Sequence, residues 1–293
     1  MTVRLRLSIG LFVLAVAAPA AAQGNGHSYG HYKHPAPPPQ GSGSATDSAA
    51  PAVTATGARI FGAWLDDASL MGPGDGMMSV SFGWFKSPVF REFDAPVFDG
   101  GVGILPRVQL GFSVPYYHVS EPGGPVARGL GDFLFSAKIQ VRNPDAHAVG
   151  FAVTPVLEVL SSDPGPDVRR VNWALPVSAE FRQPRWRVFG SAGYFSRGSV
   201  FGAGALEVGV SDRAWVTGTI TRSYSTLAED VGATFGLGPS RTDASGGLTY
   251  SVSPALTVFG SIGRTISKQD VDSASLVVSA GASFGFLAWK PHR

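Results

Sequence analysis

Long segments in which apolar and polar side chains alternate are the feature that most constrains this chain. Residues 129–141 show the pattern clearly, because one set of alternate positions is apolar and the other is largely polar. The apolar set is Phe133, Phe135, Ala137, Ile139 and Val141, and the polar set is Asp132, Ser136, Lys138 and Gln140. Successive side chains of a strand point to opposite faces, so the pattern predicts a strand with two different surfaces. The apolar surface would cover a core in a soluble sheet, or face lipid in an outer-membrane barrel.

The same alternation recurs along most of the chain, about twelve times in segments of about 9–14 residues. The predicted strands cover residues 76–84, 97–104, 108–116, 129–141, 149–158, 171–182, 185–196, 199–211, 213–224, 242–252, 255–267 and 273–287. Strands of soluble proteins are most often about 5–6 residues long, whereas tilted transmembrane strands need about 9–11. Strand length therefore favours a membrane barrel.

The connections between the predicted strands alternate in length. Short turns are expected at 105–107, 143–147, 183–185, 211–213 and 253–255, and longer connections at 86–96, 117–128, 161–169, 225–241 and 267–272, with 197–198 as the exception. Outer-membrane barrels combine short periplasmic turns with longer extracellular loops, and an even strand number returns both termini to the periplasm. Because lipid offers no partner to an open sheet edge, the first and last strands must pair. We expect a single antiparallel up-and-down transmembrane β-barrel of about twelve strands over residues 58–293, in the outer membrane.

Aromatic residues gather near both ends of the predicted strands, as the interfacial girdles of a lipid-facing barrel do. Trp84, Tyr116, Trp173, Tyr194 and Tyr224 fall near the long-loop side, and Trp186, Tyr250 and Trp289 near the short-turn side. Trp215 does not fit this pattern, because its position in the alternation is inward.

The N-terminus predicts export and a linker. Residues 1–22 have the form of a secretory signal peptide: Arg4 and Arg6, an apolar stretch over 7–18, and a Pro-Ala-Ala-Ala cleavage region. The alternative, an uncleaved anchor, is disfavoured because the apolar stretch is shorter than the roughly 20 residues that span a bilayer. Residues 23–57 are rich in Pro, Gly, Ser and Ala, and predict a disordered linker.

The linker contains His27, His31 and His34, half of the six histidines of the chain. Clustered imidazoles can bind Cu or Zn. The alternative is that these histidines are incidental to a soluble tail. The sequence is compatible with both hypotheses.

Composition excludes several functions. The absence of Cys excludes disulfides, thiol catalysis and Cys-ligated metal centres. A net charge of +2 is too small to indicate nucleic-acid binding. Neither a G-x-S-x-G nor an H-E-x-x-H motif occurs, and the Gly-x-Gly pairs lack the setting of a nucleotide-binding loop. We therefore expect neither an enzyme nor a cofactor.

Charged residues on the inward set of positions are the candidate pore-lining residues. They are Arg107, Asp132, Lys138, Glu158, Glu180, Arg182, Arg187 and Glu207. They could line a selective channel, or pair with one another and brace the barrel interior. Eight-stranded barrels are filled by side chains and 16-stranded barrels leave an aqueous channel, so about twelve strands predict a restricted path.

Four segments, at 65–84, 103–117, 129–141 and 208–220, resemble the phenol-degradation meta-pathway family of outer-membrane transporters. The resemblance extends over residues 60–289 and implies passage of small hydrophobic or aromatic solutes across the outer membrane. The expected partners are outer-membrane lipids, a small-molecule solute and the barrel-assembly machinery. The residues after Trp289 differ from the terminal aromatic with which such barrels commonly end. A structural or adhesive surface barrel with no transport activity is the alternative.

Overall fold

A computed structural model describes most of the chain after the predicted linker. The described residues are 65–88, 90–120, 126–161, 170–196, 198–226, 240–267 and 273–290, with the backbone alone described for Val126, Ala127 and Ala146. The predicted signal peptide, the linker and its three histidines lie outside these ranges. Within the described ranges, no helix is both long and apolar enough to cross a membrane.

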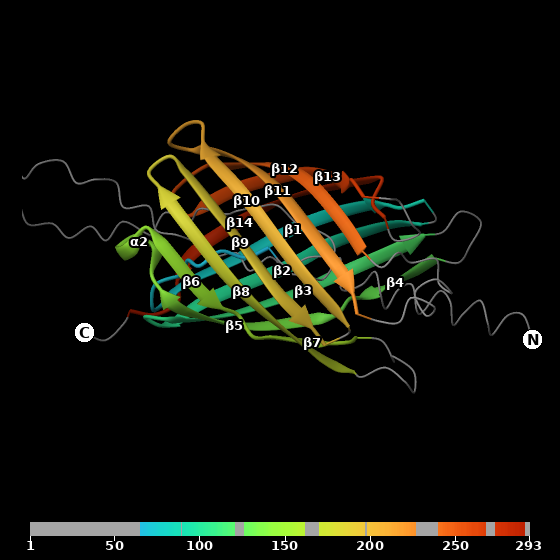
Figure 1. The fold of residues 1–293 in the computed structure, drawn as a ribbon, viewed down its shortest axis with the longest axis horizontal. Helices are drawn as coiled ribbons and strands as arrows, with labels where there is room; N and C mark the ends of the chain where they lie inside the picture. Colours follow the sequence, from blue (N-terminus) through green and yellow to red (C-terminus); the bar gives the residue numbers. More distant parts are fainter. Residues whose placement is uncertain are drawn as a thin grey trace, which may run out of the picture.

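Fourteen strand segments form one antiparallel sheet in the described part of the chain. They are β1 (Asp75–Lys86), β2 (Arg91–Leu105), β3 (Val108–Ser120), β4 (Val126–Leu130), β5 (Phe133–Arg142), β6 (Val149–Val153), β7 (Val156–Val159), β8 (Val171–Gln183), β9 (Trp186–Phe195), β10 (Ser199–Gly209), β11 (Ala214–Ser225), β12 (Ser240–Ser251), β13 (Leu256–Thr265) and β14 (Leu276–Leu287). A one-turn helix, α2 (Pro144–His147), joins β5 to β6. The sheet closes on itself because β1 pairs with both β2 and β14. Figure 1 shows the front and back walls of this barrel, whose strands cross at an angle.

Two pairs of these segments each act as one interrupted strand. Both β4 and β5 pair with β3, and the interruption falls at Gly131 and Asp132. Both β6 and β7 pair with β5 and β8, and are separated by Thr154 and Pro155. Fourteen segments therefore make twelve strands around the described barrel, which confirms the predicted architecture.

The alternation in the sequence becomes a division between the outer wall and the lumen. In β8, Val171, Trp173 and Leu175 are all more than 40% exposed, whereas Asn172 and Glu180 are buried. Large apolar side chains on the outside and charged ones inside are the reverse of a soluble protein, and match a wall that faces lipid. Trp215 points inward and is buried, as its place in the alternation indicates.

The short turns lie together at one end of the barrel, where the chain also enters β1 and leaves β14. In α2, the side chain of Asn143 caps the helix by accepting a hydrogen bond from the Asp145 N–H at 2.9 Å. Outer-membrane barrels place short turns and termini in the periplasm. We call this the periplasmic end, and the opposite end, which carries β4 in Figure 1, the loop end.

Two connections are shorter than predicted. The one expected at 117–128 is shortened because β3 continues to Ser120 and β4 begins at Val126. A long connection is expected at 86–96, but β1 ends at Lys86 and β2 already begins at Arg91. Pro96, which has no N–H group, argues against a strand there. The structure accommodates it at a register shift between Asp94 and Val97, so β2 continues past the proline.

Candidate functional site: the barrel lumen

The chain immediately before β1 lies inside the barrel, and we call residues 65–73 the luminal segment. Asp66, Asp67, Ala68 and Ser69 are all at most 3% exposed, although they belong to no strand of the barrel wall. The segment is fixed at the periplasmic end by a bridge between Pro73 and Gly103. The barrel therefore carries a piece of its own chain in the lumen.

Buried ion pairs hold the luminal segment to the wall. Lys138 Nζ lies 2.5 Å from Oδ1 of Asp66 and 3.4 Å from Oδ1 of Asp67. Arg187 donates through Nη1 to Oδ2 of Asp67 at 2.8 Å, and through Nε to Oε1 of Glu207 at 2.6 Å. All five side chains are at most 3% exposed. A buried side chain stays charged only when it is paired and hydrogen-bonded. Loss of one of these side chains would therefore leave its partner as an unpaired buried charge.

Further hydrogen bonds continue this network around the wall. Gln140 donates through Nε2 to the Ala68 carbonyl at 2.8 Å, from β5. The Met71 N–H donates to Oε1 of Gln109 at 3.0 Å, on β3. The luminal segment also bonds to Thr154 (2.9 Å from Asp66), Ser178 (2.8 Å from the Asp67 carbonyl), Ser191 (3.2 Å from the Asp66 N–H) and Glu180 (2.7 Å from the Ser69 hydroxyl). The segment is therefore anchored to the stretch of wall from β3 to β9, in the periplasmic half of the lumen.

The structure brings five of the predicted inward charges together in this network. Lys138, Glu180 and Arg187 contact the luminal segment directly, and Glu207 contacts Arg187. Arg182 donates to Oδ1 of Asp145 at 2.7 Å and to Oε1 of Glu180, and also bonds to the Ser69 hydroxyl. Their position in the wall was predictable from the alternation, but their contact with residues 66–69 was not.

The other three predicted residues lie apart from this network. Asp132 and Glu158 are buried nearer the loop end, where Asp132 accepts from the Ser161 N–H at 3.1 Å and Glu158 from Asn172 Nδ2 at 3.0 Å. Arg107 lies in the β2–β3 turn and is exposed, so the inward position expected for it is not observed. The turn reverses the chain here, and alternation does not extend through it. Across the described ranges, no group of three or more His, Asp or Glu side chains could hold a metal ion.

The loop half of the lumen carries apolar side chains on the inner wall. Leu134, Val156, Ala174, Phe195 and Phe201 form one buried cluster, which we call the luminal apolar patch. Its members come from five elements, β5, β7, β8, β9 and β10, and take inward positions. Sequence reasoning missed this patch because it treated the inward set as polar. The available signal was Leu134, the one apolar residue among the inward positions of its strand.

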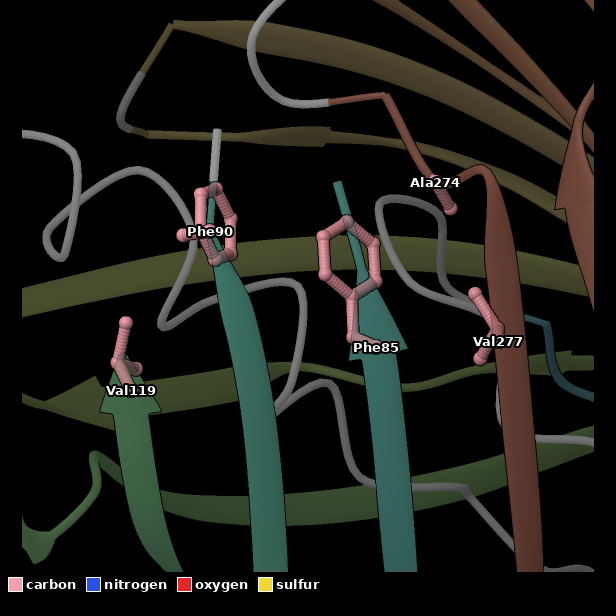
Figure 2. Packing of buried hydrophobic residues seen from close by; sticks show 5 residues of the cluster. All are labelled: Phe85, Phe90, Val119, Ala274 and Val277. Carbon is pink, nitrogen blue, oxygen red and sulfur yellow. The ribbon is translucent and has the colours of Figure 1, made fainter. Parts of the chain in front are cut away.

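A second apolar cluster lies at the loop end, on the opposite part of the wall. Figure 2 shows this mouth cluster, Phe85, Phe90, Val119, Ala274 and Val277, all of them at most 8% exposed. The rings of Phe85 and Phe90 stack, with centroids 5.4 Å apart and planes 23° apart. The periplasmic half of the lumen thus holds the ion-paired luminal segment. The loop half has apolar side chains on two parts of the wall, beside buried charges that include the Arg241–Asp243 ion pair.

Comparison with known proteins shows a fold that this barrel shares. The chain matches no family model and no curated protein. Among solved structures it is similar to an outer membrane channel from Pseudomonas putida F1, with a TM-score of 0.56 and 13% identity over 75% of this chain and 98% of that one. It also matches the KdgM porin (TM-score 0.48, 8% identity, 71% and 99% covered) and OprB of Pseudomonas putida (TM-score 0.40, 9% identity, 72% and 91% covered). The first likeness shows a shared fold. The closed barrel and its apolar outer wall place this protein in the outer membrane, among lipids. The resemblance to the phenol-degradation family stays a prediction.

Proposed function

We propose that this barrel is a channel for the passive passage of small hydrophobic or aromatic solutes across the outer membrane. The observation that carries the proposal is the luminal apolar patch, of which Phe195 and Phe201 are the largest members. The interior of an outer-membrane barrel is ordinarily polar. Apolar side chains that face inward on five neighbouring elements match a solute whose own surface is apolar, because its transfer from water onto such a wall is favourable.

The mouth cluster supports the same solute class at the point of entry. Phe85 and Phe90 stack on each other inside the loop end and are each 2% exposed, so they would have to part for a solute to reach them (Figure 2). Aromatic solutes pack against such rings in offset or edge-to-face arrangements. A solute that enters from the loop end would therefore meet apolar side chains before it reaches the luminal segment.

The charged side chains have a separate role in this proposal. Lys138, Glu180, Arg182, Arg187 and Glu207 hold the luminal segment across the periplasmic half, so they would close the path while the segment is docked. Asp132 and Glu158 would line the path beside the luminal apolar patch, since Glu158 pairs in register with Leu134. Passage then requires the segment to move.

Entry of an apolar fluorescent probe tests the proposal. N-phenyl-1-naphthylamine fluoresces when it reaches an apolar phase, and an intact outer membrane slows its entry. A host depleted of its own porins and producing this protein should take up the probe several-fold faster than the same host with an empty vector. Arabinose entry into proteoliposomes is the reference for a hydrophilic solute. We expect little arabinose to enter. Probe entry at the rate of the empty vector would contradict the proposal.

A structural or adhesive barrel without transport is the second candidate. The buried ion pairs between Lys138, Arg187 and the luminal segment favour it, because they hold a piece of the chain inside the lumen. Under this alternative neither probe enters, whatever variant is used. Probe entry in the unmodified protein excludes it.

A further inference from the structure

Four basic side chains form a continuous row on the outer wall at the loop end of β1 to β4, and we call them the basic ladder. Lys86 on β1 is directly opposite Arg91 on β2. His118 on β3 is directly opposite Arg128 on β4. Because His118 is also opposite Phe93, two residues from Arg91, it is the diagonal neighbour of Arg91. Direct and diagonal neighbours in a sheet are within reach of long side chains, so the ladder crosses four strands without a gap.

The ladder faces away from the lumen. All four side chains are exposed, whereas their sequence neighbours Phe85, Glu92 and Val119 are buried on the inner side. Since adjacent residues of a strand point to opposite faces, the ladder belongs to the outer surface of the barrel. The carboxylates of β2 that could have neutralised it, Glu92, Asp94 and Asp99, are all buried inside.

No anionic side chain compensates the ladder within the described ranges. Lys86, Arg91, His118 and Arg128 make no ion pair and no side-chain hydrogen bond there, whereas Lys138 and Arg187 in the lumen are each paired. Like charges directly opposite one another destabilise a sheet. Lys86 and Arg91 take that arrangement. An anion outside the described residues would therefore be needed to neutralise their charges.

The depth of the basic ladder in the membrane indicates which anion this is. On each of the first three strands, the outward residue two positions nearer the membrane centre is aromatic: Trp84 below Lys86, Phe93 below Arg91 and Tyr116 below His118. Trp and Tyr of membrane barrels lie at the level of the lipid headgroups. The next outward position therefore lies among the phosphates of the lipid.

We propose that the basic ladder binds the phosphate groups of the phosphorylated glycolipid in the outer leaflet. Anionic headgroups attract Lys and Arg close to the membrane surface. The planar guanidinium groups of Arg91 and Arg128 match phosphate oxygens in bidentate geometry. Lys86 adds a compact ammonium charge on β1, opposite Arg91. The inference depends on the barrel and its orientation, and does not depend on transport.

Lipid binding by purified full-length protein in detergent tests the proposal. The probe is lipid A with both phosphates, and native mass spectrometry counts the copies that remain bound as its concentration is raised. The variant Lys86→Gln/Arg91→Gln/Arg128→Gln should bind at least tenfold more weakly than the unmodified protein. Lipid A with its phosphates removed should bind both proteins equally weakly.

Two matched controls remove the same number of charges elsewhere. Arg170→Gln/Arg222→Gln/Arg264→Gln changes exposed loop-end residues that are not neighbours in the sheet, and Arg142→Gln/Arg185→Gln/Arg213→Gln changes exposed residues at the periplasmic end. Both should keep the affinity within about twofold. An equal loss of lipid A affinity in either control would show that general charge attraction binds the lipid, and this would overturn the proposal. Full displacement of lipid A by millimolar inorganic phosphate would instead indicate a site for the free ion, and unchanged binding in the ladder variant would overturn the proposal outright.

Discussion

Arg187 on the barrel wall and Asp67 before the first strand form an ion pair, with Nη1 and Oδ2 2.8 Å apart and each side chain 1% exposed. The same guanidinium binds Glu207 through Nε at 2.6 Å, so one side chain joins β9, β10 and the luminal segment. Removing one partner of a buried pair costs about 3–5 kcal/mol because the other charge is left unpaired. The luminal segment is therefore held by a few pairs whose loss should release it.

Replacing Lys138 by Met should open the lumen. Met fills much of the same volume but cannot pair with Asp66 or Asp67, which Lys138 contacts at 2.5 and 3.4 Å. In the variant Asp66 loses its cation, and Asp67 keeps only Arg187, 2.8 Å away. A buried carboxylate without its cation favours movement of the segment into water, at a cost of the order of 3–5 kcal/mol to the docked state. We expect single-channel conductance or open probability in planar bilayers to rise several-fold in Lys138→Met.

Lys290→Met is the matched control for this measurement, because Lys290 is exposed beyond β14 and makes no ion pair in the described chain. Its conductance should equal that of the unmodified protein. A folded Lys138→Met barrel with unchanged conductance would show that Lys138 does not hold the segment in place.

A thiol placed at Ala68 should report whether the segment is docked. The chain contains no Cys, so Ala68→Cys introduces one thiol, at a side chain that is 0% exposed. Maleimide should label it slowly in the otherwise unmodified barrel. Adding Lys138→Met should accelerate labelling at least tenfold, because the segment spends more time in water. Equal labelling rates in the two proteins would mean that the segment remains docked without its ion pair.

The barrel itself was predictable from the sequence because its determinants are local. Alternation within residues 171–182 gives one apolar face, and β8 exposes that face to lipid while burying Glu180. Twelve such alternating segments and the turns between them are enough to predict a closed twelve-stranded barrel. The prediction was wrong at 86–96, where Pro96 interrupts the pattern but a register shift lets β2 continue.

The lumen was predictable only in part. Lys138 and Arg187 were identified as inward charges, but their partners Asp66 and Asp67 are 72 and 120 residues away in sequence. No local pattern encodes a contact over such a distance. The luminal apolar patch was missed for a related reason: each of its residues occupies one inward position on a different element, and only the closed barrel places them together.

Gly103 should be intolerant of a side chain because the luminal segment approaches it closely. A Cβ atom at this position would collide with the backbone carbonyls of Gly72 and Met71, neither of which can turn away as a flexible side chain can. Gly103→Ala should therefore displace the segment at the periplasmic end and raise the labelling rate of Ala68→Cys. Gly204→Ala is the matched control, since a Cβ there has nothing within 4 Å. Slow labelling in both variants would contradict the close approach that the structure shows.

The luminal apolar patch should determine which solutes pass. Phe195→Ser/Phe201→Ser replaces its two rings by hydroxyls on the inner wall, where the lipid-facing surface is unaffected. An apolar solute then loses apolar contact area worth about 25 cal/mol per Å², and its entry should fall several-fold. N-phenyl-1-naphthylamine uptake by cells gives the rate, and heat-modifiable migration on gels confirms that the barrel is folded. Phe195→Leu/Phe201→Leu keeps the patch apolar and should retain most of the uptake. If a folded serine variant transports the probe as fast as the leucine variant, the apolar wall does not select the solute.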